Sequence, residues 1–499
     1  MNLSSPAVVV SLPARTISDA RKEMEEASRS GADLIEIRFD RFRGEEIARV
    51  GELFPTPLPL VATVRSRAEG GEGPDDPEAR LRILSDLARH PFRWIDAEAA
   101  RDFPSSEAFL RPGVCGLIVS SHATTPIRES EWKRLLRQRV PRGTIRKVVA
   151  AAPVGQLLRE LIPSLPPPGE SPLVALTTGP SGPLLRAWSR RFRFPLVYAS
   201  LPERTDRAWP PPVEPSQIPV DRLRAYLDAE GNPPLFAIVG RPVGHSRSPA
   251  IHSRWMRESG RAGLFVALEF ESDKELVESV PSLIEGGFRG LSVTHPFKEV
   301  ALHLATQVGP GALACGVANT LSFDPEGVEA ENTDLVAILR RLEELRLSGR
   351  WDGSSLGVIG AGGAARATLA ATRSLGVESH VWARRPEASD LLAHEFGAHP
   401  VHGPRQARPP LVVHATTIGR AAGESPSLPD LDWLRPGIHV IDWVYAPDDP
   451  ITRLTAEKAG ATYEDGSRLL VYQAAAAYGI WWGDGPTSEQ TSAALEGVS

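Results

Sequence analysis

The stretch SSLGVIGAGGAARA, residues 354–367, decides the fold of the second half of this 499-residue chain. Its first half is apolar and predicts a strand, and its second half is rich in alanine and predicts a helix. Between them, Gly360, Gly362 and Ala365 have the GxGxx(G/A) spacing of a turn that brings a helix N-terminus close to a pyrophosphate. The stretch therefore predicts a dinucleotide-binding α/β unit.

The segment after this helix indicates which dinucleotide is bound. ESHVWARRP, residues 378–386, is typical of the next strand and contains Arg384 and Arg385 about 20 residues beyond the glycines, where an NAD site usually has an acidic residue. Guanidinium groups instead suit a 2′-phosphate, because they form bidentate, charge-assisted hydrogen bonds with it. The sequence therefore favours NADP (NADPH) over NAD as the cofactor.

The first half of the chain has a different pattern, in which short apolar runs alternate with longer helix-like segments. The expected strands are AVVVSL (7–12), DLIEIRF (33–39), LPLVATV (58–64), FRWIDA (92–97), GVCGLIVSS (113–121), IRKVVAA (145–151), PLVALTT (172–178) and PLVYASL (195–201). Eight βα units predict a closed (β/α)8 TIM barrel, although an open doubly wound sheet gives a similar pattern. The proline-rich residues 202–234 then indicate a domain boundary or a closing loop.

Composition excludes several classes of function. The hydrophobic fraction of 41% and the charged fraction of 24% are those of a globular protein, and the net charge of −6 offers no basic face for nucleic acid. Cys115 and Cys315 lie far apart in sequence, so we expect neither a disulfide nor a metal site. The N-terminus lacks a secretory pattern, and the apolar residues 469–482 are too few to span a bilayer. We expect a soluble, cytoplasmic protein without nucleic-acid or membrane partners, and the oligomeric state stays open.

The second half carries motifs that follow one another in the order of a known family. They are GRPVGHSRSPAIH (240–252), GLSVTHPFK (290–298), GVANTL (316–321), ENTD (331–334), GAGGAA (360–365), HATTIG (414–419), DWVYAP (442–447) and EDGSRLLVYQAA (464–475). By these motifs, residues 235–483 resemble shikimate dehydrogenase. The resemblance implies a substrate-binding domain, a Rossmann-type NADP-binding domain and the reduction of a carbonyl with NADPH.

The same resemblance implies roles for single residues. Lys298 and Asp334 match the family's catalytic pair, in which the lysine donates a proton to the reacting oxygen. The implied substrate contacts are two serines for the carboxylate and four residues for the ring hydroxyls: Ser246, Ser248, Thr294, Asn319, Asp334 and Gln473. The implied cofactor contacts are Gly360, Gly362, Gly363, Ala364, Arg384, Arg385 and Thr416.

A shorter and looser set of motifs lies in the first half. These motifs are EIRFD (36–40), TVRSRAEGGE (63–72), VSSH (119–122), RKVVAAAP (146–153), GPSGPLLR (179–186) and PSQIPV (215–220). Residues 1 to about 225 thereby resemble type I 3-dehydroquinate dehydratase, a (β/α)8 barrel that works through a Schiff base.

Lysine chemistry agrees with this second resemblance. Lys147 lies inside an apolar strand, where desolvation favours the neutral, nucleophilic amine, and its implied role is to form an imine with a ketone. His122 ends the preceding strand and matches the residue that removes a proton and then protonates the departing hydroxyl. The implied substrate contacts are Glu36, Arg38, Arg65, Arg186 and Gln217, with Arg186 at the substrate carboxylate.

Six positions depart from the two family patterns. In the dehydratase pattern, Val213 and Leu185 each replace a serine and Glu214 replaces an alanine, and we expect these changes to affect substrate affinity and closure of the last loop. In the dehydrogenase pattern, Ser292 replaces an asparagine, and Ala383 and Arg385 replace the asparagine and the threonine that flank Arg384 after the second cofactor strand.

We therefore expect a bifunctional enzyme of the shikimate pathway, which leads to the aromatic amino acids. The barrel would convert 3-dehydroquinate to 3-dehydroshikimate, and the second half would reduce that product to shikimate with NADPH. The expected domains are a dehydratase barrel over 1–230, a substrate-binding domain over 231–345 that is completed by about 465–490, and an NADP-binding domain over 346–464. Two alternatives remain: a barrel fused to a catabolic quinate/shikimate dehydrogenase, and a non-catalytic sensor of pathway intermediates.

Overall fold

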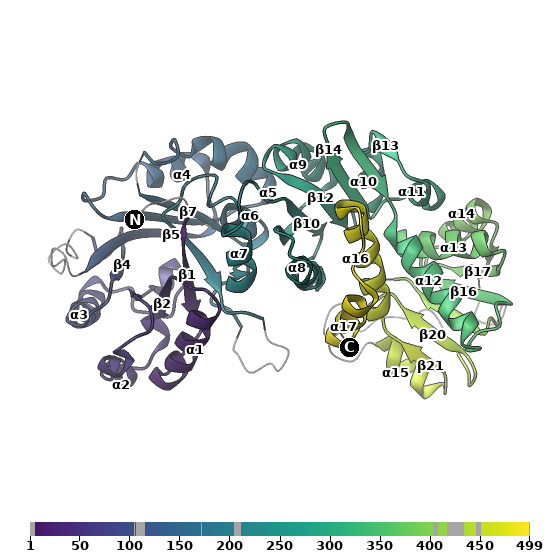
Figure 1. The fold of residues 1–499 in the computed structure, drawn as a ribbon, viewed down its shortest axis with the longest axis horizontal. Helices are drawn as coiled ribbons and strands as arrows, with labels where there is room; N and C mark the ends of the chain where they lie inside the picture. Colours follow the sequence, from purple (N-terminus) through teal and green to yellow (C-terminus); the bar gives the residue numbers. More distant parts are fainter. Residues whose placement is uncertain are drawn as a thin grey trace. The chain divides into compact units, whose positions relative to one another are not determined.

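A computed structural model describes residues 5–103, 105, 115–170, 172–203, 211–402, 408–416, 434–445 and 451–498. The chain divides into two compact units (Figure 1). The first contains residues 1–235, 242–244 and 262–287, and the second contains residues 236–241, 245–261 and 288–499.

A parallel sheet forms the centre of the first unit. Its strands are β1 (Ala7–Leu12), β2 (Leu34–Arg38), β3 (Leu60–Thr63), β4 (Trp94–Glu98), β5 (Gly116–Pro126), β6 (Ile145–Ala151), β7 (Leu173–Thr178), β8 (Leu196–Ser200) and β9 (Ile218–Pro219). They follow the order β7-β6-β5-β4-β3-β2-β1-β8-β9, so neighbours in sequence are neighbours in the sheet from β1 to β7. All eight strands expected from the sequence are present, and the (β/α)8 prediction is confirmed.

The edges of this curled sheet meet at a seam between β7 and β8, where a regular barrel would have a further pair of hydrogen-bonded strands. Within the described residues no ladder joins β7 to β8, and the short strand β9 pairs with β8 instead. Arg186 spans the seam, because it donates to the carbonyl of Thr177 in β7 at 2.8 Å and to that of Tyr198 in β8 at 3.2 Å. The wall is thus completed by a guanidinium and by the segment that follows the last barrel strand.

Amphipathic helices alternate with the strands of the first unit. In α1, the buried positions Ile17, Ala20, Met24 and Ala27 recur every three or four residues, and Thr16 caps the N-terminus. The helices of this unit are α1 (Ile17–Arg29), α2 (Gly44–Ile47), α3 (Pro77–Leu87), α4 (Glu129–Leu136), α5 (Val154–Gln156), α6 (Gly182–Ala187), α7 (Val220–Leu227) and α9 (Asp273–Glu285).

A mixed six-stranded sheet follows the barrel in sequence. Its strands are β10 (Leu235–Gly240), β11 (Leu264–Glu269), β12 (Phe288–Val293), β13 (Gln307–Val308), β14 (Thr320–Asp324) and β15 (Gly327–Glu331), in the order β11-β10-β12-β14-β15-β13. Strand β14 is antiparallel to both β12 and β15. The accompanying helices of the second unit are α8 (Ser248–Glu258), α10 (Lys298–His303), α11 (Pro310–Cys315) and α12 (Thr333–Leu347).

The predicted dinucleotide-binding unit is built on a third, parallel sheet. Its strands are β16 (Ser355–Ile359), β17 (Glu378–Trp382), β18 (His399–Pro400), β19 (Leu411–His414), β20 (His439–Asp442) and β21 (Thr462–Glu464). The order β18-β17-β16-β19-β20-β21 is the doubly wound 3-2-1-4-5-6 order, whose switch point lies between β16 and β19. Ligands bind at the carboxyl edge of such a switch point.

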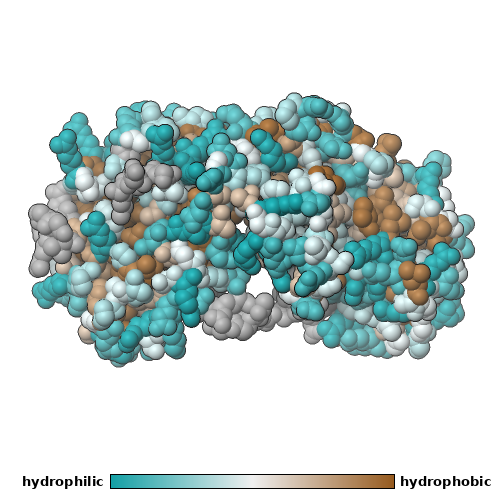
Figure 2. Space-filling model, viewed as in Figure 1, coloured by the Kyte–Doolittle hydropathy of each residue, from teal (hydrophilic) through white to brown (hydrophobic). Residues whose placement is uncertain are grey.

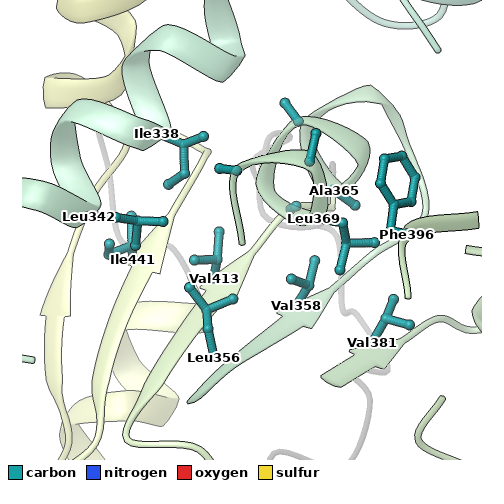
Figure 3. Packing of buried hydrophobic residues seen from close by; sticks show 14 of the residues in the cluster. Ile338, Leu342, Leu356, Val358, Ala365, Leu369, Val381, Phe396, Val413 and Ile441 are labelled. Carbon is teal, nitrogen blue, oxygen red and sulfur yellow. The ribbon is translucent and has the colours of Figure 1, made fainter. Parts of the chain in front are cut away.

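Helices complete the dinucleotide-binding unit. They are α13 (Gly363–Leu375), α14 (Pro386–Phe396), α15 (Ile451–Lys458), α16 (Ser467–Trp482) and α17 (Ser488–Val498). Figure 3 shows Leu369 of α13 and Ile338 of α12 pointing toward the sheet residues Val358 and Val413. This buried core fixes the glycine turn between β16 and α13.

Figure 2 shows a face on which hydrophilic residues predominate over scattered hydrophobic patches. Among the described residues, no helix is long and apolar enough to cross a membrane. The apolar residues 469–482 belong to α16, and Leu469, Val471 and Ala474 of that helix are buried.

Candidate active sites

A pocket of about 250 Å³ lies at the carboxyl ends of the barrel strands. Strand alternation places Glu36 and Arg38 of β2 in its wall, as their spacing of two residues predicts. Further lining residues include Ser11, Thr63, Arg65, Glu69, His122, Lys147, Arg186, Tyr198, Val213, Glu214 and Gln217. All seven barrel residues for which the sequence analysis implied a role therefore line one pocket.

Lys147 lies in the buried part of this pocket. Its Nζ is 3.0 Å from Oδ2 of Asp96, 3.6 Å from Oε1 of Glu36 and 4.0 Å from the ring centroid of Tyr198. Burial disfavours the Asp96 carboxylate, but the charges of Arg65 and Lys147 outweigh burial and hold the pKa of Asp96 well below its usual range. The lysine thus faces carboxylates on two sides and a π-face, which together stabilise a cation at its nitrogen.

His122 is paired with a carboxylate that the sequence analysis did not single out. Its Nδ1 lies 3.0 Å from Oε2 of Glu69, which also accepts from the His122 backbone N–H at 3.1 Å. Burial, together with the charges of Arg65 and Lys147, holds the pKa of His122 well below its usual range, so the ring is neutral at neutral pH. Burial raises the pKa of Glu69 to about 7. A neutral imidazole beside a carboxyl group is suited to accept a proton.

Two residues that were predicted to bind substrate donate hydrogen bonds to other side chains of the protein. Arg65 donates to Glu69, Asp96, Glu98 and Ser120 at 2.7–3.3 Å, so it organises the carboxylates of the pocket. Arg38 makes two 2.8 Å hydrogen bonds to Asp40. The placement of these residues confirms only that they line the pocket.

Arg186 is a further buried cation that lines this pocket. It is 2% exposed, and its Nε and Nη1 atoms donate to the carbonyls of Thr177, Gly182 and Tyr198. Burial lowers the pKa of Arg186 to about 10, and the carboxylate of Glu214 acts in the opposite direction. Within the described residues Nη2 donates to no protein atom, so it can receive an anionic ligand.

The segment after the last barrel strand lies against the pocket. Gln217 donates to Oγ of Ser11 at 3.2 Å, and Ser11 donates to Glu36 at 2.6 Å. Val213 lines the pocket where the family pattern has a serine, and Glu214 lines it beside Arg186. The departures in this segment therefore exchange a hydroxyl for an apolar group and add a carboxylate.

The second unit brings its own lysine to an aspartate. Lys298 begins α10, and its Nζ lies 2.5 Å from Oδ2 of Asp334 in the first turn of α12. The amide of Asn319 donates to Oδ1 of Asp334 at 2.9 Å and to the hydroxyl of Thr333 at 3.0 Å. Both amide hydrogens of Asn319 are thus used inside the protein, which indicates that this residue orients Asp334.

The glycine turn lies directly against Lys298. An added Cβ at Gly363 would lie 2.6 Å from Cδ of Lys298, so a side chain there would displace the lysine. Gly360 has φ +129°, and Gly362 has open space around its Cα and caps α13. This small-residue cradle at a helix N-terminus fits a pyrophosphate.

The arginines beyond the next strand fit a charged cofactor as well. Arg384 and Arg385 are exposed and make no ion pair with a described residue, so their guanidinium groups can take a 2′-phosphate. Ala364 lies in the first turn of α13, and Thr416 follows β19 at the same edge of the sheet. The residues present therefore fit NADP.

The remaining predicted contacts are spread over three elements. Ser248 begins α8, and its buried hydroxyl has no hydrogen-bond partner among the described residues, while its N–H donates to Ser246 at 3.2 Å. The hydroxyl of Ser292 is also buried and contacts no hydrogen-bond partner in the described part of the chain, and Thr294 follows directly after β12. Gln473 of α16 donates to the carbonyl of Leu470, which leaves its side-chain oxygen as an acceptor. A polar ligand bound here can supply the partners that these two hydroxyls lack.

Sequence reasoning missed several charged or polar residues of the barrel site, among them Asp96, Tyr198 and Glu69. Asp96 and Tyr198 lie inside strands predicted only as apolar runs, and Glu69 lies in a quoted motif without an assigned role. A signal existed for Asp96, because a lone carboxylate in a buried strand needs a cationic partner. No three described His, Cys, Asp or Glu side chains are grouped as a metal ion would require. Residues 417–419 and 446–447 of two quoted motifs lie outside the described residues.

Two family models match this chain. Residues 8–233 match type I 3-dehydroquinase, and residues 238–321 match the shikimate dehydrogenase substrate-binding domain. The shikimate dehydrogenase (NADP(+)) of Acidiphilium cryptum is 36% identical over 262 residues, which are 51% of this chain and 93% of the relative. That of Sinorhizobium fredii is 37% identical over 265 residues, which are 51% of this chain and 91% of the relative.

Some solved structures are similar to about half of this chain, and one covers nearly all of it. The dehydroquinate dehydratase and shikimate dehydrogenase from S. pombe AroM is 21% identical and covers 99% of this chain and 98% of its own, with a TM-score of 0.42. Shikimate 5-dehydrogenase from Thermus thermophilus, in complex with NADP(H) and shikimate, is 30% identical and covers 53% of this chain and 100% of its own, with a TM-score of 0.48.

Proposed function

This chain belongs to the shikimate dehydrogenase family and carries a type I 3-dehydroquinase domain before it, and we propose how its residues divide the work of the two reactions. The protein is a bifunctional enzyme of the shikimate pathway. Its first domain dehydrates 3-dehydroquinate to 3-dehydroshikimate, and its second part reduces that ketone to shikimate with NADPH.

Lys147 and His122 carry the dehydration in this proposal. The amine of Lys147 attacks the substrate ketone, whose oxygen leaves as water, and the resulting imine acidifies the neighbouring C–H bond. His122 removes that proton and then returns it to the departing hydroxyl, so one water leaves and the base is restored. After the elimination, water hydrolyses the imine and frees the lysine. The two carboxylates beside Lys147, Asp96 and Glu36, stabilise the positive charge that the iminium retains.

Arg186 binds the substrate carboxylate in the same proposal. Its Nη2 is the part of the guanidinium that no described residue uses, and a charge-assisted hydrogen bond there fixes the ring relative to Lys147. Gln217, which already contacts Ser11, closes the pocket over the ring.

Lys298 performs acid catalysis in the second reaction. NADPH supplies the hydride when it is bound, while Lys298 donates a proton to the oxygen of the reacting carbonyl. Asp334 holds the ammonium at 2.5 Å, and Asn319 holds Asp334. Ser246 and Ser248 bind the substrate carboxylate, and Thr294 and Gln473 contact ring hydroxyls.

One observation carries the proposal for the second reaction: Lys298 contacts both Asp334 and the glycine turn. A proton donor at the edge of a dinucleotide cradle is what carbonyl reduction requires, because proton and hydride must reach neighbouring atoms.

The purified full-length chain is mixed with 3-dehydroquinate and NADPH, and NADPH absorbance is followed. We expect oxidation only when both reagents are present. Oxidation with 3-dehydroshikimate but not with 3-dehydroquinate would refute the dehydration and leave the reduction. Faster turnover of quinate than of shikimate in the reverse direction would favour the catabolic alternative.

A further inference from the structure

A series of hydrogen-bonded polar side chains ends at the proposed dinucleotide-binding turn. His414 ends β19 and Asp442 ends the neighbouring β20, and both side chains are fully buried. Nδ1 of His414 lies 3.0 Å from Oδ1 of Asp442, and Nε2 lies 2.8 Å from Oγ1 of Thr416. The roles assigned above use neither His414 nor Asp442.

The hydrogen bonds around Asp442 determine which atoms donate and which accept in this series of side chains. The backbone N–H of Val444 donates to Oδ1 at 2.9 Å, and the hydroxyl of Tyr463 donates to Oδ2 at 3.2 Å. Burial and the Asp442 charge raise the pKa of Tyr463, so this hydroxyl keeps its proton. Asp442 therefore acts only as an acceptor, and the hydrogen between it and His414 belongs to Nδ1. Nδ1 therefore carries the ring hydrogen, and Nε2 is the acceptor to which Thr416 donates.

The same segment is packed against the glycine turn. An added Cβ at Gly360 would lie 2.5 Å from the carbonyl oxygen of Ala415 and 3.3 Å from Cγ2 of Thr416. The N–H of Ala415 donates to the carbonyl of Ile359 at 2.7 Å, directly before the turn. Thr416 is therefore held at the carboxyl edge of the sheet, beside the switch point.

We propose that His414 is a positioning residue for NADPH, because it takes the hydroxyl hydrogen of Thr416 and turns that hydroxyl into an acceptor. The hydroxyl then receives a hydrogen bond from a donor of the dinucleotide, which is either a ribose hydroxyl or the nicotinamide carboxamide. Without His414 as its acceptor, the hydroxyl of Thr416 can rotate, and its oxygen is no longer oriented to accept from the dinucleotide. The inference rests on the proposed NADPH-dependent function.

NADPH binding to the full-length chain is measured by titration calorimetry without substrate, beside KM and kcat of the reduction. We expect Thr416→Val to weaken binding by about tenfold, the loss of one hydrogen bond. His414→Leu should cause a similar loss, and the double variant should be no weaker than Thr416→Val alone. KM for NADPH should rise more than kcat falls. Thr416→Ser keeps the hydroxyl and should retain the affinity.

The chain offers a matched control in the same sheet. His439 is also buried, and its Nδ1 lies 2.7 Å from Oγ1 of Thr462. It begins β20, whereas Asp442 ends it, so this second His–Thr pair lies at the amino edge, away from the glycine turn. His439→Leu and Thr462→Val should leave NADPH affinity unchanged, and dehydratase activity should be unchanged in every variant.

A cofactor analogue separates the two donors. With an NADPH analogue whose carboxamide is replaced by an acetyl group, Thr416→Val should cause no further loss if the donor is the carboxamide. An undiminished tenfold loss would assign the donor to the ribose, and both results agree with an accepting hydroxyl.

Three outcomes would contradict the inference or its premise. A wild-type chain that does not bind NADPH would refute the proposed function. A wild-type chain that binds, with Thr416→Val and His414→Leu binding equally well, would overturn only the inference, as would additive losses in the double variant. If His414→Leu does not fold, Thr416→Val and Thr416→Ser still decide, because neither removes a partner of Asp442.

Discussion

Lys147 in the barrel and Lys298 in the second unit each have an aspartate within 3.0 Å, but the two lysines differ in everything else that surrounds them. The side chain of Lys147 is 5% exposed, with a second carboxylate at 3.6 Å and an aromatic ring at 4.0 Å. The side chain of Lys298 is 16% exposed and contacts a glycine of the dinucleotide turn.

The difference follows from where the positive charge goes in each proposed reaction. The nitrogen of Lys147 becomes part of an iminium and keeps its charge until the product leaves, so two buried carboxylates suit it. Lys298 gives its proton away and has to regain one from water, so a single carboxylate and partial exposure suit it. The same side chain thus serves two chemistries because its surroundings differ.

The largest effect should come from Lys147→Ala. We expect dehydration to fall by about 10⁴-fold or more, since no other group can form the imine. Reduction of 3-dehydroshikimate by the same chain should be unchanged. Borohydride in the presence of substrate should add mass to the wild type but not to the variant, and a labelled variant would place the imine on another lysine.

Lys298→Ala should impair only the other reaction. We expect kcat for reduction to fall by about 10²- to 10⁴-fold, the contribution of a general acid. NADPH affinity, measured by calorimetry, should change little, because the lysine acts on the carbonyl. Equal damage to both activities in a folded chain would contradict the division into two sites.

Glu69→Gln tests the partner of His122. Because the pKa of Glu69 is raised to about 7, this group is protonated below that pH and charged above it, where it stabilises the imidazolium that forms during proton removal. Dehydration by the wild type should therefore rise between pH 6 and pH 8. We expect the variant to be roughly tenfold slower at pH 8 and to lack this rise, as measured by initial rates. A rise that persists in the variant would assign the titration to another group.

Glu214→Gln should have the smallest effect, and it should be a gain. The Glu214 carboxylate lines the pocket beside Arg186 and opposes the carboxylate of the substrate, so its neutralisation should lower KM for 3-dehydroquinate about fivefold. Glu170→Gln, which removes the same charge from an exposed loop, serves as the control. A higher KM in Glu214→Gln would mean that this residue binds the substrate instead of repelling it.

The regular parts of both units were predictable from local patterns. All eight barrel strands were expected within a few residues, because a buried parallel strand is a continuous apolar run. The turn from Gly360 to Ala365 was predictable from the spacing of its glycines, and close packing explains Gly360 and Gly363. Lys147 was found inside such an apolar strand, and Lys298 was found through a motif that ends where α10 begins.

Contacts between distant segments were not predictable in this way. The pairing of His122 with Glu69 joins positions 53 residues apart, and the Asp442–His414–Thr416 chain joins two strands whose adjacency depends on the sheet order. Arg65 was expected to bind substrate, and only the three-dimensional structure shows that four protein groups already use its donors.

The seam between β7 and β8 gives the barrel a property beyond catalysis. Arg186 joins the two strands there, and the same guanidinium has an unused Nη2 for an anion. We expect a carboxylate bound by Arg186 to stabilise the barrel wall at this seam, where no ladder joins β7 to β8 among the described strands. Amide hydrogen exchange in β7 and β8 should therefore slow when a carboxylate ligand binds, and an uncharged ring of the same shape should leave it unchanged. The rate of amide exchange in these two strands would thus depend on the charge of the bound ligand.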